Sequence, residues 1–258
     1  GVTVNPTSLL VSEAGLTATY QVALTSQPVM SGSGAATQVY WISGSSPSKI
    51  RRANLDGSNA TDLVSSGLVL PLQLAVEATG GKLYWIDASA ADKLKRANLD
   101  GSSVEALSQS GVVAPKGLAL DVAGGKLYYT DSGTVRRANL DGSNPETLVS
   151  GLDTPQYLTL DLSGDKMYWI GGSDSSKIQR ANLDGSGLED VVTGLFIGGS
   201  LTVDGAAGKL YWGEMDALRR ANLDGSATET LWTGSFAFIN GLALNPAEGK
   251  IYWSLDSG

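Results

Sequence analysis

The sequence predicts an all-β protein, a six-bladed β-propeller in which each blade contains four strands. Three observations lead to this prediction. The 258-residue chain repeats one unit about every 40 residues, each unit contains several short runs of strand-forming residues, and no segment has the sustained periodicity of a helix. Four-stranded units at this period are typical of β-propellers.

The string Arg-Ala-Asn-Leu-Asp-Gly-Ser is the clearest repeat. It occurs five times, and successive copies start 44, 41, 43 and 40 residues apart. Its Asp-Gly pair predicts a tight hairpin turn, because both central positions of such a turn favour positive φ. The copies begin at Arg52, Arg96, Arg137, Arg180 and Arg220.

A second string, Lys-Leu-Tyr-Trp or a close variant, occurs six times and predicts an aromatic strand that fills the core. An apolar string of the type Gly-Leu-Ala-Leu-Asp precedes every copy except the first, and it predicts a strand buried on both faces. The aromatic positions are Tyr40, Trp41, Tyr84, Trp85, Tyr128, Tyr129, Tyr168, Trp169, Tyr211, Trp212, Tyr252 and Trp253.

Each repeat therefore predicts four strands, which we name A to D. Strand A is the apolar string, strand B is Lys-Leu-Tyr-Trp, strand C carries Arg-Ala-Asn, and strand D is of the Glu-Thr-Leu-Val type. The five motif arginines have two interpretations: a basic ring for an anionic ligand, or one structural contact in each blade, often with a carboxylate. We favour the contact, because five arginines and five strand-B lysines use 10 of the 18 basic residues.

The repeated strings resemble the motif of a known protein family. Lys-Leu-Tyr-Trp-Ile-Asp at 82–87 and Lys-Leu-Tyr-Tyr-Thr-Asp at 126–131 resemble the YWTD motif. Together with Arg-Ala-Asn-Leu-Asp-Gly, they make residues 38–258 similar to the class B repeats of the LDL receptor. The resemblance implies a six-bladed propeller in an extracellular protein. Four copies depart from the motif at its last two positions, which indicates that the final Asp is dispensable.

The predicted strands do not complete six blades. The motifs provide six B strands and five each of A, C and D, so 21 strands are present where 24 are needed. The missing strands are A of the first blade and C and D of the last. We therefore divide the chain into residues 1–37, an N-terminal strand extension with a Gly/Ser hinge, and residues 38–258, the propeller.

The N-terminal extension contains three strand-like runs at 2–4, 8–12 and 17–24. Residues 1–28 resemble the opening strands of a Calx-β or other Ig-like module, but thirty residues cannot bury a core of their own. The extension could complete the open blade in cis, enter the open blade of another copy in trans, or belong to a longer chain. The proposed assembly strands contain Val2, Val4, Leu9, Leu10, Val11, Tyr20, Val22 and Leu24.

Composition excludes several kinds of function. The chain has no His and no Cys, which excludes imidazole bases, thiolate nucleophiles and the usual zinc and iron–sulfur sites. A net charge of -8 does not favour nucleic acid, and no apolar run is long enough to span a membrane. The acids after strand A, Asp121, Asp161 and Asp204, suit turn capping better than calcium binding. We expect no cofactor, no metal and no enzymatic activity.

The segments between strand D and the next strand A differ from one repeat to the next. All three Phe residues of the chain lie there, and variable loops on a rigid scaffold often carry specificity. These segments either pack between blades or form an apolar interface for a partner. The candidate interface residues are Phe196, Ile197, Trp232, Phe236 and Phe238.

The sequence favours a non-catalytic protein of the cell exterior or cell surface. Our first hypothesis is a self-associating fibre, surface-layer or adhesin subunit, in which each N-terminal strand enters the incomplete propeller of a neighbour. The alternative is a monomeric receptor-type propeller that binds a protein or glycan through its loop face.

Overall fold

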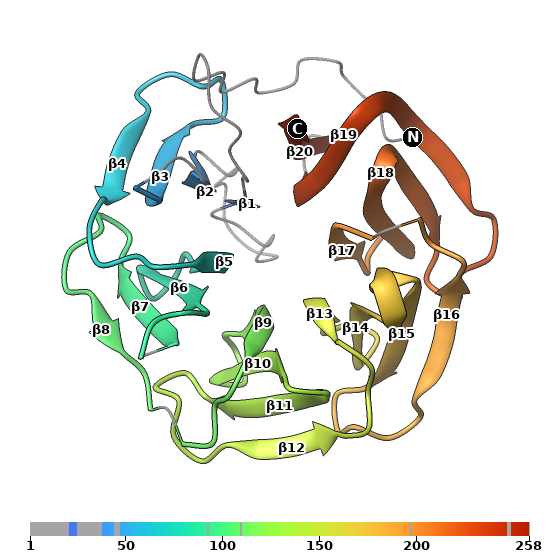
Figure 1. Ribbon diagram of the computed structural model, residues 1–258, viewed down its shortest axis with the longest axis horizontal. Helices are drawn as coiled ribbons and strands as arrows, with labels where there is room; N and C mark the ends of the chain where they lie inside the picture. Colours follow the sequence, from blue (N-terminus) through green and yellow to red (C-terminus); the bar gives the residue numbers. More distant parts are fainter. Residues whose placement is uncertain are drawn as a thin grey trace.

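The computed structural model describes residues 21–24, 38–43, 47–91, 93–108, 110–196, 198–246 and 249–257. For residues 21–24, 235–237 and 255–257 it describes the backbone alone. The described residues form five antiparallel sheets of four strands each, and Figure 1 shows these sheets arranged around a common centre as the blades of a propeller. The prediction of an all-β propeller with four-stranded blades is therefore confirmed.

The first sheet contains β1 (Gln21–Leu24), β2 (Gln38–Ser43), β3 (Lys49–Asn54) and β4 (Thr61–Val64). The second contains β5 (Pro71–Glu77), β6 (Lys82–Asp87), β7 (Leu94–Asn98) and β8 (Glu105–Ala106). The third contains β9 (Pro115–Asp121), β10 (Lys126–Asp131), β11 (Thr134–Asn139) and β12 (Glu146–Val149).

The fourth sheet contains β13 (Gln156–Asp161), β14 (Lys166–Gly171), β15 (Lys177–Asn182) and β16 (Glu189–Thr193), with the short 3₁₀ helix η1 (Ser173–Ser175) between β14 and β15. The fifth contains β17 (Ser200–Asp204), β18 (Lys209–Asn222), β19 (Glu229–Asn245) and β20 (Lys250–Ser257).

The prediction of six blades is wrong, because the described residues form five sheets. The sixth Tyr-Trp motif lies in β20, and β20 pairs with β19. The same strand β19 also pairs with β18, with Met215 opposite Phe238 and Arg220 opposite Glu229. One 17-residue strand thus serves as strand D of the fifth repeat and strand A of the last, so the last repeat joins the fifth sheet.

Strand A of the first sheet comes from outside the repeats. In β1, Val22, Ala23 and Leu24 lie opposite Trp41, Tyr40 and Val39. The third sheet has the same register, with Leu118, Ala119 and Leu120 opposite Tyr129, Tyr128 and Leu127. The string Val-Ala-Leu of β1 therefore takes the place that Leu-Ala-Leu takes in a repeat.

The core lies between neighbouring sheets. Trp85 of the second sheet packs with Tyr40 and Ile50 of the first, and Trp169 of the fourth packs with Tyr128 of the third. The motif aromatics of the first five repeats are all at most 2% exposed, whereas Tyr252 and Trp253 are half-buried. These aromatic side chains bury a large apolar area and so hold neighbouring sheets together.

The antiparallel order gives the ring two sides. The turns from strand A to B and the Asp-Gly-Ser turns from C to D lie on one side, which we call the turn side. The segments that link one sheet to the next lie on the other, which we call the connection side. The linking segments before β5, β9, β13 and β17 are residues 65–70, 107–114, 150–155 and 194–199.

Candidate functional site

On the turn side, the motif arginines join neighbouring sheets. The Nη1 atoms of four of them donate to the Leu carbonyl in the Asp-Gly-Ser turn of the next sheet: Arg52 to Leu99 (3.3 Å), Arg96 to Leu140 (3.4 Å), Arg137 to Leu183 (3.3 Å) and Arg180 to Leu223 (2.8 Å). The Nε atoms of Arg96, Arg137, Arg180 and Arg220 donate to Glu105, Glu146, Glu189 and Glu229 of strand D at 2.6–2.7 Å. The motif arginines therefore make structural contacts within and between the sheets.

The acids of the turn side also bond locally. In the Asp-Gly-Ser turns, Oδ1 of Asp56 accepts the N–H of Ser58 at 2.9 Å, and the same bond recurs in the other four turns. The hydrogen bonds from Ser58 hold the pKa of Asp56 below its usual value. Asp121, Asp161 and Asp204 accept N–H groups three residues further on, at 2.8–3.0 Å. They cap the turns from strand A to strand B.

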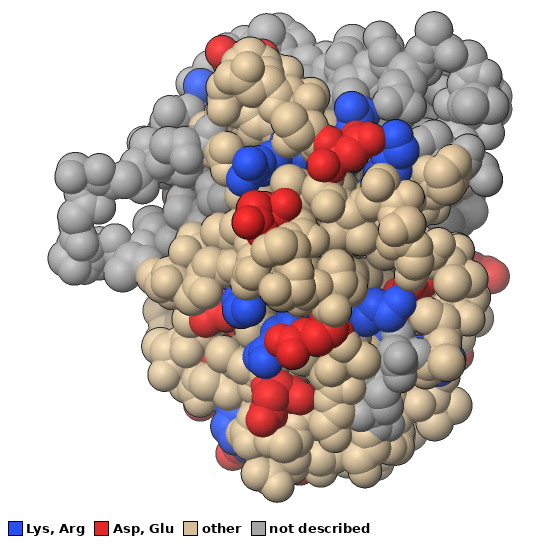
Figure 2. Space-filling model, turned by 90° about the vertical axis from the view of Figure 1, so that its left-hand side faces the viewer, with Lys and Arg blue, Asp and Glu red and all other residues tan. Residues whose placement is uncertain are grey.

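No group of three or more residues that could hold a metal ion occurs in the part of the chain that the structure describes. Glu214, an acid that could have served in acid–base chemistry, is 5% exposed and accepts the indole N–H of Trp212 at 2.8 Å. It also pairs with Nε of Arg219 at 3.2 Å. Figure 2 shows that basic and acidic side chains on the face it presents lie beside one another in several small groups, and they do not form a single-sign patch.

Large apolar side chains are exposed on both sides of the ring: Val104, Leu162 and Leu188 in turns of the turn side, and four others on the connection side. Val69 is 61% exposed, Leu70 48%, Val113 62% and Phe196 60%. All four lie in segments that link one sheet to the next. Exposed side chains of this kind that share one side of a rigid scaffold are typical of an interaction surface.

Two buried carboxylates hold two of these linking segments in place. Asp87 is 0% exposed and accepts the N–H groups of Val69 (3.0 Å) and Leu70 (2.7 Å). Asp131 is 3% exposed and accepts those of Val113 (3.1 Å) and Ala114 (2.6 Å). Asp87 and Asp131 thus each bind two successive backbone N–H groups beside or within exposed apolar residues. Hydrogen bonds to a charged acceptor are stronger than those to a neutral one.

Sequence reasoning missed these two residues, because it treated the final Asp of the motif as dispensable. The signal was present in the sequence: Asp87 and Asp131 belong to the two copies that keep the final Asp of the motif. It also missed Val69, Leu70 and Val113, because it started from the Phe residues and considered only their neighbours.

The predicted interface residues lie in different environments. Phe196 is exposed on the connection side. Trp232 is half-buried and packs against Trp253, with ring centroids 6.1 Å apart, and Phe238 is half-buried in β19. Ile197 lies outside the described residues, and the side chain of Phe236 is among those not described. The structure therefore places Phe196 with Val69, Leu70 and Val113 on the connection side, and it places Trp232 in the packing of the fifth sheet.

The predicted assembly strands lie mostly beyond the described residues. Val2, Val4, Leu9, Leu10, Val11 and Tyr20 are in the part that the structure does not describe, while Val22 and Leu24 lie in β1. The β1 backbone pairs with β2 of its own chain.

The geometry can be compared with known proteins. Residues 81–122 match the family model of the low-density lipoprotein receptor repeat class B. The chain therefore contains a class B repeat. This match spans β6 to β9 and confirms the family resemblance of the YWTD-like motifs for that stretch. No curated protein matches the chain.

Solved structures share the fold at low identity. A chain of a nidogen/laminin complex has a TM-score of 0.67 and 23% identity, over 86% of this chain and 82% of that one. A gluconolactonase from Xanthomonas campestris has a TM-score of 0.70 and 18% identity, over 85% and 80%. TolB from Acinetobacter baumannii has a TM-score of 0.68 and 12% identity, over 84% and 54%. Similarity at this level establishes the propeller fold alone.

Within the described residues, the structure contains no helix with the length and apolar character needed to cross a membrane.

Proposed function

We propose that the chain is a non-catalytic, extracellular propeller that binds a protein partner through its connection side. The observation that carries this proposal is the exposure of Val69, Leu70, Val113 and Phe196 in linking segments, two of which are fixed by buried carboxylates. A fixed apolar surface binds with a smaller loss of conformational entropy than a mobile one. Exposed aliphatic groups suit a protein partner better than a glycan, whose hydroxyl groups need polar partners.

An extracellular location is supported by the class B repeat at 81–122, since that family occurs in extracellular proteins. A non-catalytic role is supported by the absence of His and by the structural use of Glu214, Asp121 and Asp161. The gluconolactonase neighbour provides a direct test of this point. We expect no hydrolysis of glucono-δ-lactone above the uncatalysed rate, and turnover by the purified chain would contradict the non-catalytic assignment.

The binding surface is tested with a random peptide library displayed on phage and a variant in which Val69, Leu70, Val113 and Phe196 are replaced by Ser. Peptides enriched on the unmodified chain should lose most of their binding to this variant, because its exposed apolar area is removed. The matched control replaces Leu162 and Leu188 by Ser, since these exposed apolar residues lie outside the linking segments. Binding that survives the first variant, or that the control variant removes, would overturn the assignment.

Self-assembly by strand donation is the second candidate. It is favoured by the position of β20 at the edge of the fifth sheet, because an edge strand can pair with a strand of another copy. It is disfavoured by the pairing of β1 with its own β2. Light scattering over a range of concentrations separates the two candidates. We expect the mass of the monomer, 26.7 kDa, at every concentration. A mass that rises with concentration and returns to the monomer value after removal of residues 1–20 would instead support assembly.

A further inference from the structure

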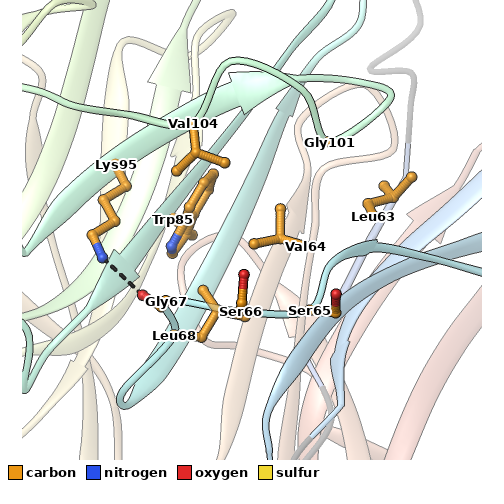
Figure 3. A pocket seen from close by; sticks show the side chains of 10 residues that line it. All are labelled: Leu63, Val64, Ser65, Ser66, Gly67, Leu68, Trp85, Lys95, Gly101 and Val104. Carbon is orange, nitrogen blue, oxygen red and sulfur yellow. Dashed lines mark hydrogen bonds between the residues drawn. The ribbon is translucent and has the colours of Figure 1, made fainter.

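A pocket of about 410 Å³ lies between the first and second sheets. Figure 3 shows its two walls. One wall is formed by the end of β4 and by residues 65–68 of the linking segment, and the other by Trp85 of β6, Lys95 of β7 and the turn after β7. Its volume falls within the range of small binding sites in proteins.

Both walls of the pocket are fixed. At one end, the ammonium group of Lys95 donates to the carbonyl of Gly67 at 3.2 Å and to Asp87 at 3.0 Å. At the other end, the turn after β7 packs directly on β4, where a Cβ atom at Gly101 would lie 2.2 Å from the Leu63 carbonyl oxygen. The pocket is therefore bounded at one end by a contact between the linking segment and the second sheet, and at the other by a contact between the first and second sheets.

The pocket contains a donor that has no acceptor. Trp85 is 0% exposed, and its Nε1 atom has no hydrogen-bond partner among the residues that the structure describes. Figure 3 shows the nitrogen-bearing edge of its ring on the side toward Gly67 and Lys95. An unpaired buried donor is energetically unfavourable, so an acceptor supplied by a ligand would stabilise this site.

Comparison with the fourth and fifth sheets explains the missing acceptor. Trp169 donates to Gln179 at 3.2 Å, and Trp212 donates to Glu214 at 2.8 Å. In the second sheet, Lys95 lies opposite Trp85, as Gln179 lies opposite Trp169. Lysine has no acceptor atom, so it cannot replace the glutamine oxygen.

The chemistry of the walls defines the ligand. Val64, Leu68 and Val104 supply aliphatic surface, and Val104 is 49% exposed. The charge of Lys95 is balanced by Asp87, so the pocket offers no net charge to an ionic ligand. A suitable ligand is therefore neutral, with an aliphatic group for the walls and an oxygen atom that can accept from Trp85.

We propose that this pocket binds an aliphatic side chain of the protein partner, while a backbone carbonyl of the same segment accepts a hydrogen bond from Trp85 Nε1. The proposal rests on the proposed function and names one contact within it. The linking segment that carries Val69 and Leu70 also forms one wall of the pocket, so a single partner segment can contact both.

The experiment follows the indole N–H signals of the six Trp residues by NMR while N-acetyl-L-leucine methylamide is added. This probe carries an aliphatic side chain and neutral carbonyl groups. We expect the Trp85 signal to move downfield, as a new hydrogen bond requires, and the Trp169 signal to stay in place because Gln179 already accepts from it. The variant Trp85→Phe should bind the probe about fivefold more weakly, because it lacks the donor.

Two surface variants keep the test decisive if Trp85→Phe does not fold. Val104→Asp places a charge in the pocket wall and should abolish the shift of the Trp85 signal. Val113→Asp is the matched control, since Val113 is also exposed but does not line the pocket, and it should leave the shift unchanged.

Three results would overturn the proposal: no movement of the Trp85 signal, an equal response to methyl glucoside, or rapid exchange of the Trp85 N–H with water that the probe does not reduce. These results leave the proposed function standing if library peptides still depend on Val69, Leu70, Val113 and Phe196. If that dependence is absent as well, both proposals fail together.

Discussion

The two sides of the ring use the repeated sequence differently. On the turn side, the five Asp-Gly-Ser turns share one internal hydrogen bond, and the motif arginines reach the next sheet in four successive copies. On the connection side, the linking segments differ in sequence, and two of them are held by different carboxylates, Asp87 and Asp131. Residues repeated in most units thus join neighbouring sheets, whereas the residues that differ include the exposed apolar side chains that we propose contact a partner.

The largest expected effect concerns an anchor of the connection side. Asp87→Ala leaves Lys95 and the N–H groups of Val69 and Leu70 without their carboxylate acceptor. Breaking such a buried, hydrogen-bonded charge pair should lower the free energy of unfolding by about 3 kcal/mol. Chemical denaturation measures the loss.

Hydrogen exchange then tests whether the two anchored linking segments are held independently of one another. Exchange at Val69 and Leu70 should accelerate in Asp87→Ala and stay unchanged in Asp131→Ala, whose effect should fall on Val113 and Ala114. Equal acceleration at both segments in either variant would show that the connection side responds as one unit, contrary to the comparison.

A smaller effect is expected at a glycine of the turn side. Gly185 has φ +89, and a Cβ atom there would lie 2.3 Å from the Leu148 carbonyl oxygen of the preceding sheet. Gly185→Ala should therefore lower the free energy of unfolding by about 2 kcal/mol, since it adds a clash to the strain of positive φ. Thermal denaturation would measure the change.

Gly208→Ala is the matched control for that substitution. Gly208 also has positive φ, +65, but nothing lies within 4 Å of the position of its Cβ atom. The control should lose about 1 kcal/mol through backbone strain alone. If the two alanine variants are equally stable, the turn does not contribute the inter-sheet contact that the comparison assigns to it.

The smallest effect is expected for Tyr84, a buried aromatic residue of the second sheet. Burial raises the pKa of Tyr84 to about 12, and a hydrogen bond to Glu77 adds to the effect. The unfolded chain loses this proton near pH 10.0, while the folded protein keeps it. The contribution of Tyr84 to the free energy of unfolding is therefore complete below pH 10.0 and is lost as the pH rises to about 12.

The free energy of unfolding of Tyr84→Phe should consequently fall less steeply between pH 10.0 and about 12 than that of the unmodified protein. Near pH 7 the lost hydrogen bond should destabilise the variant by about 1 kcal/mol. Absorbance of tyrosinate during an alkaline titration measures the missing late-titrating group. An unchanged pH profile would mean that this phenol does not contribute to alkaline unfolding.

The sequence was most informative about short-range structure. Strands and turns could be assigned because Asp-Gly turns, aromatic strands and apolar strands each have a local cause. The number of blades could not be assigned from the sequence. The motifs in β19 and β20 predict a separate sixth blade, whereas backbone pairing joins both strands to the fifth sheet. The structural role of Asp87 could not be predicted either, because its carboxylate accepts hydrogen bonds from N–H groups 17 and 18 residues away in the sequence.

By itself, the sequence determined the repeat, its four strands and the turns between them, because these depend on contacts within a few residues, such as that of Asp56 with Ser58. The tertiary structure alone decided which arginine reaches which turn, across 43 to 47 residues, and which apolar side chains remain exposed. It also decided that Val22, Ala23 and Leu24 take the place of a repeat strand. These features depend on how sheets close around the ring, and that closure brings together residues whose separation no local pattern records.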